Sequence, residues 1–133
     1  YSGNNRTHMI RVPGSGRFEL RLMDGAVNPY LLQAGIIAAG MDGMKSKRNP
    51  GKPIHINMYE EAYKVKNAKK LPKNLDIALT NLSKSKVMQK AFSQKTINSY
   101  VKLRTTEIKQ FKKSSDSKKK GITNWEKTNT LDC

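Results

Sequence analysis

The sequence predicts an α+β fold, in which a short β-hairpin precedes a buried helix and a helical C-terminal region. Two segments rich in strand-favouring residues, 9–12 and 17–22, flank a Pro-Gly-Ser-Gly turn whose glycines permit a tight reversal. Beyond residue 71, apolar residues recur with the spacing of amphipathic helices. We expect the hairpin to contribute two strands to a larger antiparallel sheet that lies mostly outside this sequence.

Asn28 and Pro29 mark the start of the first predicted helix, which is expected to extend to about residue 47. Asparagine is a favoured N-cap, and proline is tolerated at the first helical position because its missing N–H would have no partner there. The helix is apolar on almost every side, so we expect it to be buried. Its apolar stretch ends at Asp42, short of the ~20 residues that a membrane span requires.

Two amphipathic helices are predicted in the second half of the chain. The first begins after Pro72, and the second carries apolar residues at helical spacing between Ile97 and Phe111. Residues 54–70 are expected to connect them to the first helix through a segment with room for one short helix.

The last part of the sequence combines a lysine-rich stretch with a helix-start signal. Residues 114–120 are polar and basic, so we expect a mobile loop there. Thr123 and Glu126 have the spacing of a capping box, which predicts a final short helix. Trp125 in this helix would either cover the domain's own core or contact another subunit.

The charge balance favours an anionic ligand. The formal net charge is +16, which would attract nucleic acid, anionic membranes or phosphorylated small molecules. Four arginines lie within the first 21 residues, whereas the lysines are scattered over the second half. Arginine binds phosphate and carboxylate through a rigid fork, while scattered helical lysines usually form a solvated face. A nucleic-acid-binding module is the alternative from a different class, but the aromatic residues are not interleaved with basic ones as a stacking surface requires.

Cysteine and histidine offer little chemistry of their own. Cys133 has no partner within the chain, so no internal disulfide is expected and a reducing, cytoplasmic setting fits best. His8 and His55 lack a second ligand at metal-binding spacing, so each is interpreted as a surface or hydrogen-bonded residue rather than a zinc ligand.

A row of charged residues is predicted on one face of the second strand. Arg17, Glu19 and Arg21 alternate with apolar residues, and strand geometry places such residues on the same face. Adjacent members would be separated by roughly 7 Å along the backbone, which leaves room for a metal ion and a phosphate oxygen between their side chains. An exposed strand with ordinary cross-strand ion pairs is the simpler interpretation. Arg11 on the facing strand favours a bound anion, because Glu19 alone cannot balance three arginines.

Residues 5–43 resemble a segment of the glutamine synthetases. They contain, in the family's order, Asn-Arg, Arg-x-Pro, Arg-x-Glu-x-Arg, Ala-x-Asn-Pro-Tyr-Leu and, after a helix of small residues, Asp-Gly. The resemblance continues to Trp-Glu at 125–126 and is closest to the type III, or GlnT-like, branch. It implies that residues 1–133 are the C-terminal portion of the catalytic domain, with the N-terminal domain and the upstream catalytic part absent.

The resemblance assigns roles to five residues. Arg6 corresponds to an arginine that contacts both ATP and glutamate, and Arg21 to a glutamate-binding arginine, which makes these two the candidate catalytic residues. Arg11 and Arg17 correspond to contacts with the phosphates of ATP. Glu19 corresponds to a ligand of the Mg²⁺ or Mn²⁺ ion that bridges the nucleotide phosphates.

The activity implied by the resemblance is ATP-dependent ligation of ammonia to the γ-carboxylate of glutamate through γ-glutamyl phosphate, which forms glutamine and assimilates nitrogen. Methylamine or another amine is the alternative acceptor. The family's enzymes are cytoplasmic homo-oligomers, dodecameric rings with active sites shared between subunits, and have no membrane partner. Because other metal ligands lie upstream, we expect the chain alone to be inactive. Tyr59 lies near a tyrosine that some bacterial relatives modify, but we expect it to serve in packing.

Overall fold

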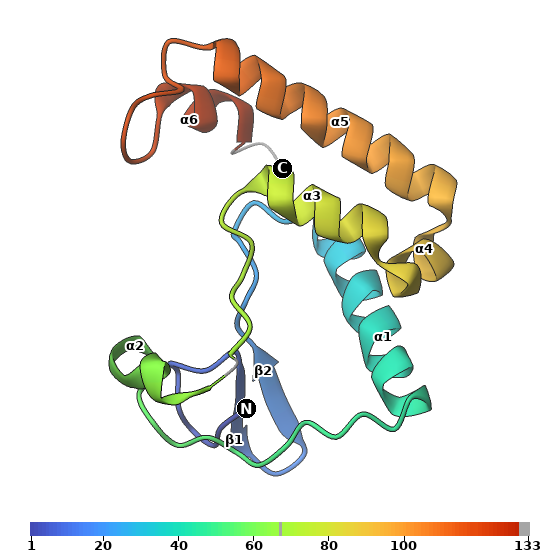
Figure 1. Ribbon diagram of the computed structural model, residues 1–133, viewed down its shortest axis with the longest axis vertical. Coiled ribbons are helices and arrows are strands. Elements are labelled where there is room, and N and C mark those ends of the chain that lie inside the picture. The colour runs from blue at the N-terminus through green and yellow to red at the C-terminus, as the bar shows by residue number, and fades with distance from the viewer. Residues whose placement is uncertain (67, 131–133) are drawn as a thin grey trace. The chain divides into compact units, whose positions relative to one another are not determined.

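The computed structural model describes residues 1–66 and 68–130, which form two compact units (Figure 1). The hairpin unit comprises Tyr1–Gly25 and Lys47–Lys70, and the helical unit comprises residues 26–46 and 71–130. Each unit is built from two separate stretches of the sequence. The predicted site residues all belong to the hairpin unit.

The hairpin unit is built on an antiparallel pair of strands, β1 (Ile10–Gly14) and β2 (Arg17–Leu20). The turn between them has Gly16 at a φ of 71°, a conformation that glycine adopts without strain. The register pairs Arg11 with Glu19 and becomes irregular between Arg11 and Gly14. Proline in this interval has no N–H to give to a regular ladder, which explains why the irregularity falls there. The predicted hairpin is therefore confirmed, with strands shifted by one or two residues at their ends.

Two further segments pack beside the hairpin. Ser2 forms a parallel bridge with Arg11, and the N–H of Ile54 donates to the carbonyl of Tyr1 at 2.9 Å. The predicted short helix is present as α2 (Met58–Glu61), followed by the 3₁₀ turn η1 (Ala62–Lys64).

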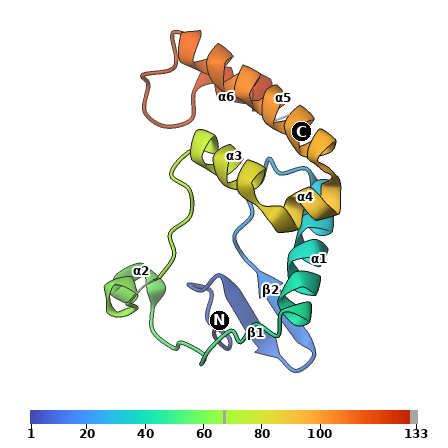
Figure 2. The same cartoon turned by 45° about the vertical axis from the view of Figure 1, so that its right-hand side comes forward.

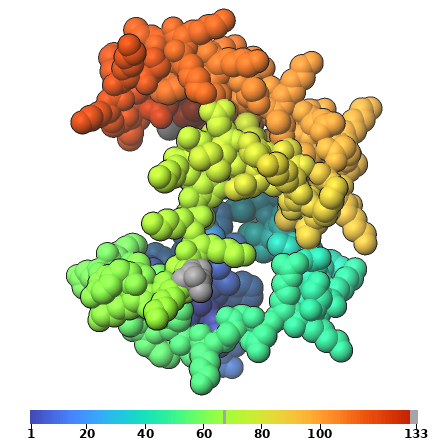
Figure 3. Space-filling view, in the orientation of Figure 1, coloured from blue at the N-terminus to red at the C-terminus, as the bar shows by residue number. Residues whose placement is uncertain are grey.

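The helical unit consists of helices that pack mainly pairwise. Its members are α1 (Pro29–Lys45), α3 (Leu75–Lys84), α4 (Lys86–Phe92), α5 (Gln94–Lys113) and α6 (Asn124–Thr130). α3 lies along α5, while α4 contacts both α1 and α5, and Figures 1 and 2 show the α3–α5 pair side by side. In Figure 3 the atoms of α3, α4 and α5 form one continuous block, coloured from yellow to orange. Leu79 of α3 and Ile97 of α5 are its buried apolar centre.

Side-chain caps fix the starts of these helices as the sequence predicted. The side-chain oxygen of Asn28 accepts from the N–H of Leu31 at 3.0 Å at the start of α1. At α6 the carboxylate of Glu126 accepts from the Thr123 N–H at 2.8 Å, and the Glu126 N–H donates back to the Thr123 hydroxyl at 3.2 Å. Trp125 of α6 packs against Phe111 of α5 with ring centroids 5.3 Å apart, which supports the interpretation that it covers its own domain.

The expected burial of α1 is wrong for this structure. No residue of α1 is buried, and Ile37 and Met44 are 62% and 74% exposed. Within its unit α1 packs mainly on α4, and one main neighbour covers only one side of a helix that is apolar all round. Among the described residues, no helix is both long enough and apolar enough to cross a membrane.

The loop expected at residues 114–120 is present, whereas the packing expected of Tyr59 is not. The stretch 114–120 is a series of turns held by Asp116, whose carboxylate accepts from the Trp125 N–H at 2.9 Å and pairs with Lys119. Hydrogen bonding by Lys119, followed by the Trp125 N–H, lowers the pKa of Asp116. Tyr59 is 82% exposed rather than packed.

Candidate anion-binding site

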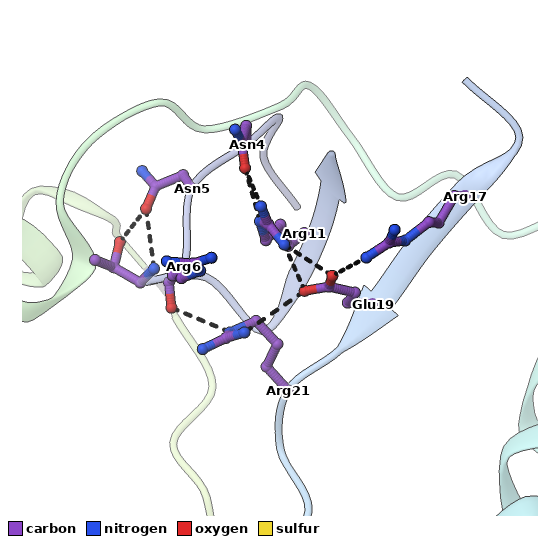
Figure 4. Close-up of polar contacts among 8 residues, drawn as sticks. Asn4, Asn5, Arg6, Arg11, Arg17, Glu19 and Arg21 are labelled. Carbon is purple, nitrogen blue, oxygen red and sulfur yellow. Dashed lines mark hydrogen bonds and ion pairs between the residues drawn. The ribbon is translucent and has the colours of Figure 1, made fainter. Parts of the chain in front are cut away.

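Glu19 on β2 is surrounded by three arginines (Figure 4). Nη1 of Arg11 donates to both carboxylate oxygens at 2.8 and 2.9 Å, and Nη2 of Arg17 donates to Oε1 at 2.7 Å. Nη1 of Arg21 lies 3.5 Å from Oε2. We call Arg11, Arg17, Glu19 and Arg21 the arginine cluster.

The backbone of the hairpin creates this cluster. Cross-strand pairing sets Arg11 directly opposite Glu19. Arg17 and Arg21 lie two residues before and after Glu19, so a strand directs all three side chains to one face. Arg21 lies one residue beyond β2, but its N–H still donates to the carbonyl of Met9 at 2.9 Å. The predicted row of charges is therefore present, and the facing arginine joins it.

The electrostatics of the cluster keep Glu19 ionised. Hydrogen bonds from Arg11 and then Arg17 lower the pKa of its carboxyl group to about 2. One negative charge faces three positive ones, so the cluster retains an excess of positive charge at neutral pH. Such a surface attracts an anion, and guanidinium groups bind phosphate or carboxylate with paired hydrogen bonds.

Exposure separates the arginines into two kinds. The side chain of Arg11 is only 11% exposed, and besides Glu19 it donates from Nε to Oδ1 of Asn4 at 2.9 Å and from Nη2 to the same oxygen. The side chain of Arg17 is 68% exposed, and that of Arg21 is 35% exposed. Arg17 is thus open to an incoming ligand, while Arg11 mainly holds Glu19.

Arg6 contacts the arginine cluster through its backbone. Its carbonyl oxygen accepts a hydrogen bond from Nε of Arg21 at 3.2 Å, while its own side chain is exposed. The structure therefore places all the predicted site residues in one unit and links them by direct contacts.

Asn4 is a site residue that sequence reasoning missed. Its contact with Arg11 exists because the bridge between Ser2 and Arg11 lays the N-terminal segment beside β1. No local spacing relates the two residues, so the sequence carried no signal for this contact.

The cluster can supply part of a metal site. Among the described residues, no group of three or more histidine, cysteine, aspartate or glutamate side chains is arranged to hold an ion. Glu19 offers the oxygen ligands that Mg²⁺ prefers and stays ionised, so it fits the role of one ligand. Mg²⁺ takes about six oxygen ligands. Phosphate oxygens and water commonly supply the other ligands of Mg²⁺ in phosphoryl-transfer sites.

A cationic hairpin that holds one ionised carboxylate is the kind of surface with which phosphoryl-transfer enzymes bind a metal–nucleotide complex. The family model for the catalytic domain of glutamine synthetase matches residues 1–126. The chain therefore belongs to the glutamine synthetase catalytic-domain family, and its α+β fold is that of a part of this domain.

Relatives with different acceptors are similar to the chain. It is 48% identical over 132 residues to a glutamine synthetase of Rhizobium meliloti (strain 1021), a match that covers 99% of this chain and 29% of that protein. It is 44% identical over 110 residues to a glutamate–methylamine ligase of Methyloversatilis universalis, covering 80% of this chain and 24% of that protein. The chain thus spans less than a third of the length of either relative.

Solved structures agree with the family assignment. The structure of a GmaS/ADP complex matches all of this chain and 29% of its own, with a TM-score of 0.79 and 41% identity. A GmaS structure without ligand matches all of this chain and 30% of its own, with a TM-score of 0.73 and 39% identity.

Proposed function

We propose that this chain is the C-terminal portion of the catalytic domain of an ATP-dependent ligase that joins ammonia to the γ-carboxylate of glutamate. The observation that carries the proposal is Glu19, kept ionised among three arginines in a chain that belongs to the glutamine synthetase family. We assign the enzyme to the GlnT-like branch, with a cytoplasmic ring of subunits as its working form. The N-terminal domain and the upstream catalytic residues would belong to the complete protein.

In this proposal the arginines bind the phosphates and glutamate. Arg17 is largely exposed and would donate to phosphate oxygens of ATP, with Arg11 and Arg6 contributing further positive charge. Arg6 and Arg21 would bind glutamate, and the bond between the Arg6 carbonyl and Arg21 Nε sets their mutual placement. Binding both substrates at one hairpin brings the γ-phosphoryl group close to the carboxylate that receives it.

Glu19 has two tasks in this scheme. It orients Arg11 and Arg17, and it would serve as one ligand of a Mg²⁺ or Mn²⁺ ion held with the nucleotide. Such an ion neutralises charge on phosphate oxygens as a Lewis acid. The arginines would stabilise the remaining charge on the phosphoryl group while it passes to glutamate, and ammonia would then displace phosphate from γ-glutamyl phosphate.

A glutamate–methylamine ligase is the second candidate. It is favoured by the similarity to the glutamate–methylamine ligase of Methyloversatilis universalis. The proposed site residues bind ATP and glutamate, so they do not distinguish between the two amines.

The test is ATP- and glutamate-dependent phosphate release by the full-length protein, with ammonium and then methylamine as acceptor. We expect Glu19→Ala to abolish release while the assembly stays intact. Glu107→Ala is the matched control, because Glu107 also pairs with an arginine, Arg104, at 2.8 Å but lies on α5. Full activity of Glu19→Ala would refute the site. The amine that gives the faster phosphate release would identify the natural acceptor.

A further inference from the structure

The turn that carries Arg6 is held by side chains on both sides of it. Nδ2 of Asn5 donates to the carbonyl oxygen of Ile56 at 3.1 Å, although the two residues are 51 positions apart. The hydroxyl of Thr7 accepts from the N–H of Met58 at 2.9 Å. Both neighbours of Arg6 are therefore bound to the segment that leads into α2.

His8 completes this contact from a buried position. His8 is only 6% exposed, and its ring nitrogen Nε2 lies 2.9 Å from the carbonyl oxygen of Ile56. Because a carbonyl oxygen only accepts, Nε2 must carry the hydrogen. We call Asn5, Thr7 and His8, together with their acceptor and donor groups on Ile56 and Met58, the latch.

Two residues of the latch also hydrogen-bond to each other. Oδ1 of Asn5 accepts from the N–H of Thr7 at 2.9 Å and from its hydroxyl at 2.7 Å. The polar atoms of Asn5 and Thr7 are thus used within the hairpin unit. Arg6 between them is exposed, and its carbonyl is tied to Arg21.

We infer that the latch positions Arg6 for substrate binding and that His8 is its buried positioning residue. This inference rests on the proposed function, in which Arg6 contacts ATP and glutamate. A side chain that projects from a fixed backbone loses less freedom when it binds a ligand, so the latch lowers the cost of binding. The latch also fixes the position of the Arg6 backbone, whose carbonyl binds Arg21, the other arginine assigned to glutamate.

A role limited to folding would have a different signature. Loss of a contact that only stabilises the unit lowers the melting temperature and leaves the KM values of the folded enzyme unchanged. Loss of a positioning contact raises KM in enzyme that is still folded. The two roles are therefore separable in one set of variants.

The experiment compares His8→Leu, which removes the donor, with His8→Gln, which keeps an N–H donor, in the full-length enzyme. KM for glutamate and for ATP, kcat and the melting temperature are measured for each. We expect His8→Leu to raise KM for glutamate roughly 2- to 10-fold, the effect of one hydrogen bond, and His8→Gln to restore most of the loss. His55→Leu is the control, because His55 is an exposed histidine next to Ile56, on the segment that His8 contacts.

Thr7→Val and Thr7→Ser give a second matched pair, since valine keeps the shape of threonine and serine keeps its hydroxyl. A rise in KM for Thr7→Val but not for Thr7→Ser supports the latch even if His8→Leu does not fold. Unchanged KM values in folded His8→Leu or Thr7→Val enzyme, with only a lower melting temperature, would overturn the inference. Failure of the proposed function is recognised independently, because wild-type enzyme would then release no phosphate with glutamate and ATP.

Discussion

Arg11 and Arg17 bind the same carboxylate, but they differ in exposure, and the difference decides what each substitution should do. Arg17→Ala removes a side chain that is 68% exposed, so we expect little change in stability. The KM for ATP of the full-length enzyme should rise roughly 10-fold, because a charge-assisted hydrogen bond to phosphate is lost. Steady-state kinetics together with thermal unfolding measures both effects, and an unchanged KM would remove Arg17 from the site.

Arg11→Ala should instead affect folding as well as activity. Arg11 is the principal partner of Glu19 and also donates to Asn4, so its loss leaves both side chains without their main donor. We expect a lower melting temperature than for Arg17→Ala, measured by calorimetry on the same assembly. Equal melting temperatures for the two variants would show that Arg11 is not the organiser of the cluster.

The low pKa of Glu19 makes its ion pairs sensitive to acid. The folded pKa of about 2 lies below the ordinary value of 4.5, so the unfolded chain binds more protons between these two values. The stabilisation is fully present above about pH 4.5 and declines as the pH falls toward 2. Urea unfolding of wild type and Glu19→Gln should therefore show a stability difference at pH 6 that shrinks at about pH 3. A difference that is constant with pH would contradict the ion-pair geometry.

The residue pattern predicted much of the cluster but not its support. Alternation along one strand was sufficient to place Arg17, Glu19 and Arg21 together. His8 is hydrogen-bonded, as one of its two interpretations had it, but its partner and the contact of Asn4 escaped prediction. Both partners are set by the pairing of separate segments, which no local spacing encodes.

The elements of the hairpin depend on one glycine. Gly16 has a φ of 71°, and a Cβ added there meets no atom within 4 Å, so the effect of Gly16→Ala is backbone strain alone. We expect a loss of about 1 to 2 kcal/mol of stability, the cost of a left-handed conformation. Gly14→Ala is the matched control, because Gly14 also has open space but no positive φ. Chemical denaturation compares the two, and equal losses would contradict this account of the turn.

The capping box at α6 provides a second test at the level of elements. Thr123→Ala removes a hydroxyl that accepts from the Glu126 N–H and donates to its carboxylate. Loss of an N-cap costs about 1 kcal/mol, so α6 and its Trp125 contact with Phe111 should loosen. Hydrogen exchange of the α6 amides should accelerate, whereas Thr128→Ala, within the same helix, should leave the rate unchanged.

The helices show where sequence prediction fails at this scale. α1, α3, α5 and α6 have clear periodicity or caps and were predicted. α4 was missed because neither glycine nor proline separates it from its neighbours. Ser85 caps the start of α4, and Ser93, with a φ of 65°, interrupts the helical conformation between α4 and α5. Serine is a much weaker signal for a break than glycine or proline.

At the scale of the whole molecule, many large apolar side chains are exposed and few are buried. An open groove between α1 and α4 is lined mainly by apolar side chains such as Ile37, Met41 and Val87. Leu79 and Ile97 are the buried apolar residues among those described. The sequence predicted a buried first helix from its composition, but burial depends on neighbours, and these 133 residues supply few.

We therefore expect the isolated chain to self-associate. Exposed apolar patches of this kind drive non-specific association. Light scattering over a range of concentrations should show growing particles, and a hydrophobic dye should bind strongly. A monodisperse monomer at high concentration would contradict this view of α1.

The central claim is that Glu19 and its arginines form the place where a metal–nucleotide complex binds. The most direct measurement is the affinity of the full-length protein for Mn²⁺ in the presence of ADP. It is measured by electron paramagnetic resonance for wild type and for Glu19→Gln. Even residues that only support a metal ligand typically contribute 10- to 100-fold to metal affinity, so we predict a loss of at least about 10-fold. The same variant at the control position, Glu107→Gln, should bind as wild type does. Equal Mn²⁺ affinity in Glu19→Gln and wild type would contradict the account, because Glu19 would then only pair with its arginines.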